Sequence, residues 1–119
     1  MKNILILIVS FIHIYILVLE MFLWTKPLGR KAFRMSETKA KETQVLAANQ
    51  GLYNGFLAAG LLWSLFSNSP EVSFQTSIFF LSCIIVAAFY GAYSVGRKIL
   101  YIQGVPAILA LIAVLFDVA

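Results

Sequence analysis

Hydrophobic and polar positions along the chain divide it into four long apolar runs. These runs cover residues 3–25, 43–66, 72–95 and 99–118. Each is close to the roughly 20 apolar residues that an α-helix needs to cross the hydrocarbon core of a bilayer. The pattern therefore predicts an all-α protein: a four-transmembrane-helix bundle with short loops, in which residues 1–119 form a single integral membrane domain.

The composition strengthens this prediction. Hydrophobic residues make up 61% of the 119 residues and charged residues only 12%, whereas about 25% of a typical soluble domain is charged. Four spans use most of the length, so no room is left for a soluble domain. The single cysteine, Cys83, lies within the third run, and the chain shows no phosphate-binding loop and no metal-ligand spacing. We expect no metal, no cofactor and no nucleic acid as partners.

The basic residues are concentrated in two of the three connections between the runs. Residues 26–42 hold six Lys or Arg against two Glu, and the third connection contains Arg97 and Lys98, but residues 67–71 hold no basic residue. Because basic loops stay in the cytoplasm, we expect a multi-pass protein of the cell (plasma) membrane. Its first and third loops would be cytoplasmic and both termini outside.

The first connection also mixes apolar side chains, such as Leu28 and Phe33, with its cations. This mixture predicts an amphipathic interfacial helix on the inner leaflet. A solvated loop that simply obeys the charge rule is the alternative.

Glu20 is the main candidate for chemistry, because it lies inside the first apolar run. A charged residue in a transmembrane helix costs about 2.5 kcal/mol or more and usually faces a bundle interior or a wet cavity. His13 precedes it by seven residues, nearly two helical turns, so both side chains lie on one face, about 10.5 Å apart along the axis. Trp24 extends the same face. Two titratable groups beside a gap of this size fit acid–base catalysis by Glu20 and His13.

A polar segment at the start of the second run supplies candidate ligand-binding residues. Its hydrogen-bonding side chains are expensive in hydrocarbon unless they find partners. At a rise of 1.5 Å per residue, Tyr90 in the third run and Gln103 in the fourth lie at a similar depth in the membrane to Glu20. The opposite ends of the helices are nearly all apolar. The predicted ligand-binding set is Asn49, Gln50, Tyr53, Asn54, Tyr90, Gln103 and Trp24. The alternative is that these side chains only hydrogen-bond one another to hold the bundle together.

Small residues spaced by four indicate how the helices pack. Gly51 and Gly55 fall on one face of the second run, and such faces let helix backbones approach closely. They predict packing within the bundle or a homodimer through the small-residue faces. In the fourth run, Pro106 lacks an N–H, so it leaves the Ile102 carbonyl without its helical partner and is expected to kink the span.

The segments FIHIYILVLEMFLW, residues 11–24, and NQGLYNGFLAAGLLW, residues 49–63, resemble the family called domain of unknown function 1304. The resemblance covers nearly the whole chain. It implies a small four-span membrane protein, mostly bacterial, and it implies no activity. Two remoter likenesses are to emopamil-binding, sterol-isomerase-like proteins, through His13 and Glu20, and to small multidrug resistance proteins, through Glu20 and the chain length.

Three functions remain open at this point. In the first, the polar pocket binds a lipophilic small molecule and converts it by acid–base chemistry, with membrane lipids as the surroundings. In the second, the chain is a proton-coupled exporter of the small multidrug type. In the third, it is a non-catalytic membrane scaffold or accessory subunit. An exporter needs one carboxylate and a scaffold needs none, so the His13–Glu20 pair favours the first.

Overall fold

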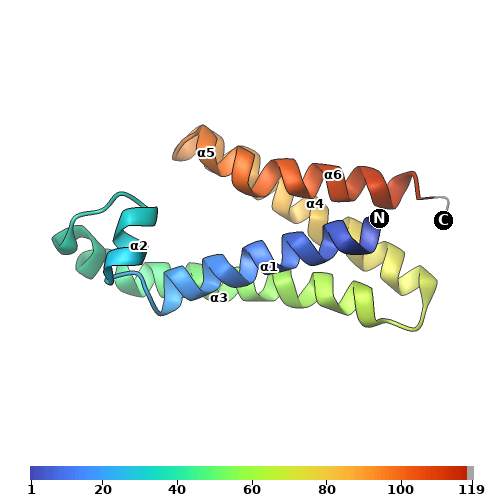
Figure 1. The fold of residues 1–119 in the computed structure, drawn as a ribbon, viewed down its shortest axis with the longest axis horizontal. Coiled ribbons are helices and arrows are strands. Elements are labelled where there is room, and N and C mark those ends of the chain that lie inside the picture. The colour runs from blue at the N-terminus through green and yellow to red at the C-terminus, as the bar shows by residue number, and fades with distance from the viewer. Residues whose placement is uncertain (118–119) are drawn as a thin grey trace. The chain divides into compact units, whose positions relative to one another are not determined.

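The computed structural model describes residues 1–117, and within them the chain is helical with no strand (Figure 1). The elements in order are α1 (Lys2–Met21), α2 (Pro27–Ala32), α3 (Glu37–Phe66), α4 (Pro70–Ser94), α5 (Arg97–Ile99), the π-helix η1 (Leu100–Gly104) and α6 (Val105–Leu115). The predicted all-α class is therefore confirmed. The last residue of the predicted fourth span, 118, lies outside the described residues.

Three helical stretches in the described part of the chain are long and apolar enough to cross a membrane. They are Lys2–Met21, Pro70–Ser94 and Arg97–Leu115, and they indicate a membrane protein. The helix that contains the predicted span 43–66 is not among them, because Asn49, Gln50 and Asn54 lower its mean hydropathy. The number of four spans is thus not confirmed by length and composition.

The helix ends differ from the predicted runs for local reasons. α1 ends at Met21, four residues before the end of its apolar run, and Lys26 is already extended (φ −83°, ψ 161°) because Pro27 follows it at the start of α2. α3 begins six residues early, at Glu37, because the Ser36 hydroxyl accepts a hydrogen bond from the Lys39 N–H at 3.2 Å. The short helix expected in the first connection is therefore present as α2.

A π-helical turn, η1, precedes Pro106, the residue at which a kink was expected. The Val105 N–H bonds to the Leu100 carbonyl, five residues back, rather than four. Because Pro106 has no N–H to donate to the Ile102 carbonyl, the regular ladder cannot continue through this point.

The chain divides into two compact units. The first comprises Met1–Ile12 together with the chain from Leu57 to its described end, and the second is His13–Phe56. α1 and α3 each contribute residues to both units.

The first unit has a hydrophobic core built from the beginning of α1, the end of α3, α4 and α6. Leu61, Leu81 and Ile84 are completely buried in it, with Ile6, Val9, Ala107, Ala110 and Val114 around them. Small residues permit this packing; a Cβ on Gly104, for example, would lie 3.2 Å from the Cβ of Ala88. Dispersion and burial therefore hold this unit together with few polar contacts.

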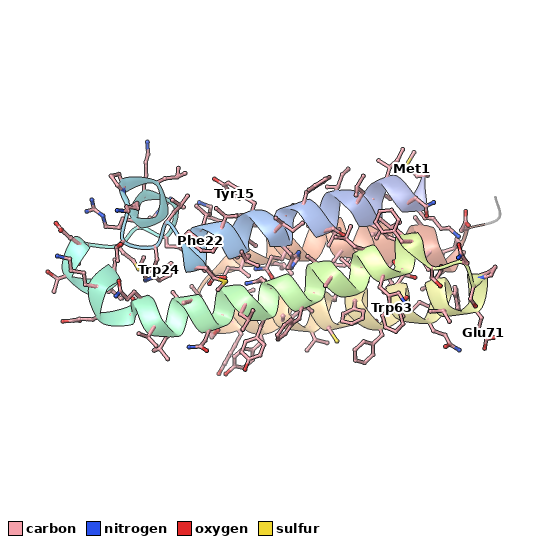
Figure 2. The ribbon with its side chains drawn as sticks, turned by 90° about the horizontal axis from the view of Figure 1, so that it is seen from below. Met1, Tyr15, Phe22, Trp24, Trp63 and Glu71 are labelled. Carbon is pink, nitrogen blue, oxygen red and sulfur yellow. The ribbon has the colours of Figure 1, made fainter. Side chains whose placement is uncertain are left out.

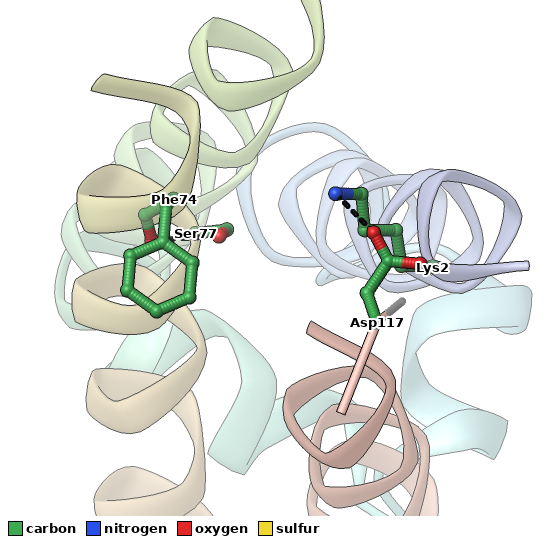
Figure 3. Close-up of polar contacts among 4 residues, drawn as sticks. All are labelled: Lys2, Phe74, Ser77 and Asp117. Carbon is green, nitrogen blue, oxygen red and sulfur yellow. Dashed lines mark hydrogen bonds and ion pairs between the residues drawn. The ribbon is translucent and has the colours of Figure 1, made fainter. Parts of the chain in front are cut away.

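One end of the first unit is polar. Lys2 Nζ lies 2.6 Å from Asp117 Oδ2, so the start of α1 and the chain just after α6 lie at the same end (Figure 3). Beside them, a cavity of about 290 Å³ is lined by Lys2, Asn3, Ile6, Ser64, Leu65, Ser67, Asn68, Pro70, Ser73, Phe74, Ser77 and Val114. The polar lining comes mainly from the start of α1, from residues 67–68 and from the beginning of α4. Ser64 and Ser77 are buried, each donating to a carbonyl of its own helix.

The second unit pairs the end of α1 with the beginning of α3 in antiparallel fashion. A Cβ on Gly51 would lie 2.6 Å from Met21 Cγ and 3.0 Å from Glu20 Cβ, and one on Gly55 would lie 2.7 Å from Leu17 Cδ1. The two helices thus approach closely along a face of glycines. In this structure, the predicted small-residue face of the second run is used for packing within the chain.

Candidate functional site

The second unit holds Glu20 in a defined place, one residue before the end of α1. Its side chain is 5% exposed, and the absence of a side chain at Gly51 makes room for its Cβ. The Asn54 Nδ2 donates a hydrogen bond to Glu20 Oε1 at 2.6 Å and a weaker one to the Gln50 carbonyl at 3.2 Å. A neutral amide donor suits a carboxyl in either protonation state, because a carboxyl oxygen can accept in both.

A cavity of about 450 Å³ lies beside this carboxyl, within the second unit. Its lining residues are Glu20, Met21, Phe22, Trp24, Thr25, Gln44, Val45, Ala48, Asn49 and Leu52. Its volume falls in the range of roughly 300–1,000 Å³ typical of small-molecule sites. Apolar walls with a few polar groups suit an amphiphilic or lipophilic molecule that carries one polar group.

The connection after α1 forms one wall of the cavity. The Trp24 Nε1–H donates to Thr43 Oγ1 at 3.0 Å, and the Trp24 ring lies 4.7 Å, centroid to centroid, from that of Phe33. Figure 2 shows Trp24 and Phe22 in this connection. Trp24 is thus fixed at both its polar end and its ring face, which gives the cavity a defined wall.

Three of the nine predicted site residues line this cavity: Glu20, Trp24 and Asn49. Asn54 reaches the site through its hydrogen bond to Glu20. His13 is completely buried on the same helix but is not among the lining residues.

The other four predicted residues lie elsewhere. Gln50 and Tyr53 are exposed on α3, and Tyr53 packs edge-on against Phe56 at 5.7 Å. Tyr90 and Gln103 belong to the first unit, where Tyr90 is 70% exposed and Gln103 half-buried. Of the predicted polar segment, Asn49 therefore lines the cavity, whereas Gln50 and Tyr53 lie exposed on α3.

Several lining residues were not predicted as site residues, and Gln44, Ala48 and Leu52 carry a usable signal. Their spacing of four places them on one helical face, next to the face of Asn49. The prediction did not include Gln44, because it considered only the polar segment that begins at Asn49.

Metal binding finds no support in the described part of the chain. No three His, Cys, Asp or Glu side chains there lie close enough together to hold a metal ion.

Comparison with known proteins gives two matches. A family model described as "Protein of unknown function (DUF1304)" matches residues 7–115. The "Uncharacterized protein YpaA" of Lactococcus lactis subsp. lactis (strain IL1403) is 36% identical over 112 residues, covering 92% of each chain. No solved structure matches the chain.

Proposed function

We propose that this chain, which belongs to the DUF1304 family, binds a lipophilic small molecule in the cavity beside Glu20. Family membership confirms the resemblance seen in residues 11–24 and 49–63, and the family description supplies no activity. The function must therefore be argued from the site.

The observation that carries the proposal is a buried carboxyl that borders an open space. Among the described residues, Asn54 is the hydrogen-bond partner of the Glu20 side chain, and it occupies Oε1. Oε2 is left for a ligand, next to a cavity of about 450 Å³ with apolar walls. Interhelical hydrogen bonds in membranes contribute only about 0.6 kcal/mol on average, which is a small return for burying a carboxyl. A binding role accounts for both the residue and the space.

The ligand chemistry follows from the groups around the space. The Glu20 carboxyl would meet an amine or hydroxyl of the ligand, and the side-chain amides of Gln44 and Asn49 could orient further polar atoms. Met21, Phe22 and Leu52 would contact its hydrocarbon part. Conversion of the ligand by Glu20 and His13, as acid and base, is the further step of this proposal and requires the ligand to reach His13.

The proposal places the site in a four-span protein. In the first unit, Lys2 and Asp117 form an ion pair, so the first and last helices have their outer ends on one side of the membrane. Two ends on the same side require an even number of membrane crossings. The three most apolar stretches alone would place the two ends on opposite sides. α3 then supplies the fourth crossing. The basic connections support an orientation with both termini outside.

Binding can be followed with Trp24 as the reporter, because it lines the cavity. In a Trp63→Phe protein, Trp24 is the only tryptophan. Dodecylamine and dodecanol, which share a chain and differ in polar group, are the probes. We expect a saturable change in Trp24 fluorescence, and we expect Glu20→Gln to weaken dodecylamine binding about tenfold and dodecanol binding less, since a charge-assisted hydrogen bond is lost only with the amine.

Two variants of α3 separate binding in the cavity from partition into the membrane. Ala48 lines the cavity, so Ala48→Phe should fill it and abolish saturable binding; Leu46 is 68% exposed and does not line it, so Leu46→Phe should leave binding unchanged. A fluorescence change that rises without saturation, and equally in both variants, would contradict the proposal.

One observation favours a second candidate, a non-catalytic scaffold or accessory subunit. Gln50 and Tyr53 lie exposed on α3, and hydrogen-bonding groups are costly in hydrocarbon without partners. A helix of another membrane protein, or of a second copy, would cover them. Purification of the unmodified chain as a stoichiometric complex that Gln50→Leu disrupts, with Ala48→Phe leaving it intact, would favour this candidate.

A further inference from the structure

We propose that the connection between α1 and α3, residues 22–36, is a docking surface for anionic phospholipid head groups. This goes beyond the ligand site at Glu20 and does not depend on it. The connection carries Lys26, Arg30, Lys31 and Arg34 and no acidic residue. Among the described residues, no ion pair involves any of the four. Four cations in so short a segment attract a negatively charged partner.

The position of the connection points to a membrane surface as that partner. It begins directly after α1, a helix long and apolar enough to cross the bilayer. The residues that follow the end of such a helix lie at the depth of the lipid head groups. Cytoplasmic leaflets are rich in anionic lipids, which attract basic segments beside a span.

Exposed apolar side chains lie among the cations. Phe22 is 66% exposed, Leu28 51% and Phe33 39%. A segment with aromatic and aliphatic side chains beside Lys and Arg can insert the apolar groups at the acyl boundary while the cations meet the phosphates. Burial of their exposed area at the acyl boundary would add hydrophobic attraction to that of the charges.

The connection has a fixed conformation rather than an open loop. Trp24 bonds to Thr43 and packs on Phe33, and Gly29 lies directly against the Leu23 carbonyl, where a Cβ would overlap it. The Arg30 carbonyl accepts from the Met35 N–H at 2.9 Å. The basic and apolar groups are thus held together in advance, which lowers the entropic cost of binding a surface.

Arg30 offers a more specific point of contact. Its Nε is buried and has no hydrogen-bond partner among the described residues. An Arg guanidinium matches the geometry of a phosphate group, so a lipid phosphate that reaches α2 would supply the missing acceptor.

Trp24 again serves as the reporter in a Trp63→Phe protein. The protein is reconstituted in phosphatidylcholine vesicles with a one-fifth share of phosphatidylglycerol, with bromine on the acyl chains of one lipid or the other. Brominated lipids quench tryptophans that they contact. Each basic residue near an anionic surface favours binding by about 1 kcal/mol, or about fivefold. We therefore expect brominated phosphatidylglycerol to quench Trp24 well beyond its share of the lipid.

The triple variant Arg30→Gln, Lys31→Gln, Arg34→Gln should remove this excess quenching, whereas Arg97→Gln, Lys98→Gln in the third connection should retain it. If the triple variant does not fold, high salt applied to the Trp63→Phe protein should reduce the excess instead. Quenching in proportion to the lipid share overturns the proposal, and so does an excess that both the triple variant and high salt leave unchanged.

Discussion

At the scale of single residues, the central feature is the contact between Glu20 and Asn54. It joins two residues 34 positions apart in the sequence with a donor–acceptor distance of 2.6 Å. Neither the spacing along α1 nor that along α3 reveals this partner, because it depends on the register between the two helices. The burial of Glu20 agrees with the expectation that a carboxyl in an apolar run faces a bundle interior or a wet cavity.

The Asn54 amide should contribute measurably to stability. We expect Asn54→Ala to lower the free energy of unfolding by about 0.6–1.7 kcal/mol, between the average and the maximum measured for interhelical hydrogen bonds in membranes. Asn49→Ala is the matched control, because the Asn49 amide donates only to the Val45 carbonyl of its own helix, and it should cost less. Titration with SDS in mixed micelles measures both, and equal losses would argue against the contact.

At the scale of helices, Gly51 and Gly55 determine how α1 and α3 meet. A Cβ at Gly51 would collide with Met21 and Glu20 near the backbone, whereas at Gly55 it would meet only the end of the Leu17 side chain. Gly96 has no atom within 4 Å of such a Cβ. The three glycines therefore offer a graded series.

We expect Gly51→Val to destabilise the protein by about 1–3 kcal/mol, as overpacking does. Gly55→Val should cost less, and Gly96→Val should be close to neutral. The same SDS titration gives the order. A loss of stability in Gly96→Val as large as that in Gly51→Val would show that the α1–α3 contact does not cause the destabilisation.

The helix ends show how far the sequence predicts the fold. The apolar runs gave the long helices, and the mixed composition of residues 26–42 predicted a short helix there. The predicted ends were less accurate, because they followed hydropathy, whereas Pro27 ends the segment after α1 and Ser36 caps α3. The lining of the cavity was predicted only in part. Asn49 lies on α3 and Trp24 in the connection after α1, whereas Gln44, also on α3, was not among the predicted residues.

At the scale of the whole molecule, the number and direction of the spans is the main prediction. In a Cys83→Ala background, Ser36→Cys, Asn68→Cys and Lys98→Cys place one thiol in each connection. Four spans predict that an impermeant maleimide labels Asn68→Cys in intact cells and the other two only after permeabilisation. If α3 did not cross, Ser36→Cys and Asn68→Cys would label alike.

The charge distribution supports the same orientation, because the proposed docking surface carries its basic residues in the first connection. Residues 22–36 are basic without any acidic residue, and they directly precede α3, whose less apolar composition is due to its polar segment. The residues that weaken α3 as a span therefore include Asn49 and Asn54, which line or support the proposed site. A helix that must carry a polar site is expected to look less apolar than its neighbours.

Photolabelling tests the central claim most directly, because it locates the ligand. A dodecylamine that carries a diazirine and an alkyne is added to the reconstituted protein, with and without excess dodecylamine, and the modified peptides are identified by mass spectrometry. We predict competable labelling confined to residues 20–25 and 44–52, lost in Ala48→Phe and kept in Leu46→Phe. Labelling spread over all the apolar helices, without competition and unchanged in Ala48→Phe, would contradict a binding site beside Glu20.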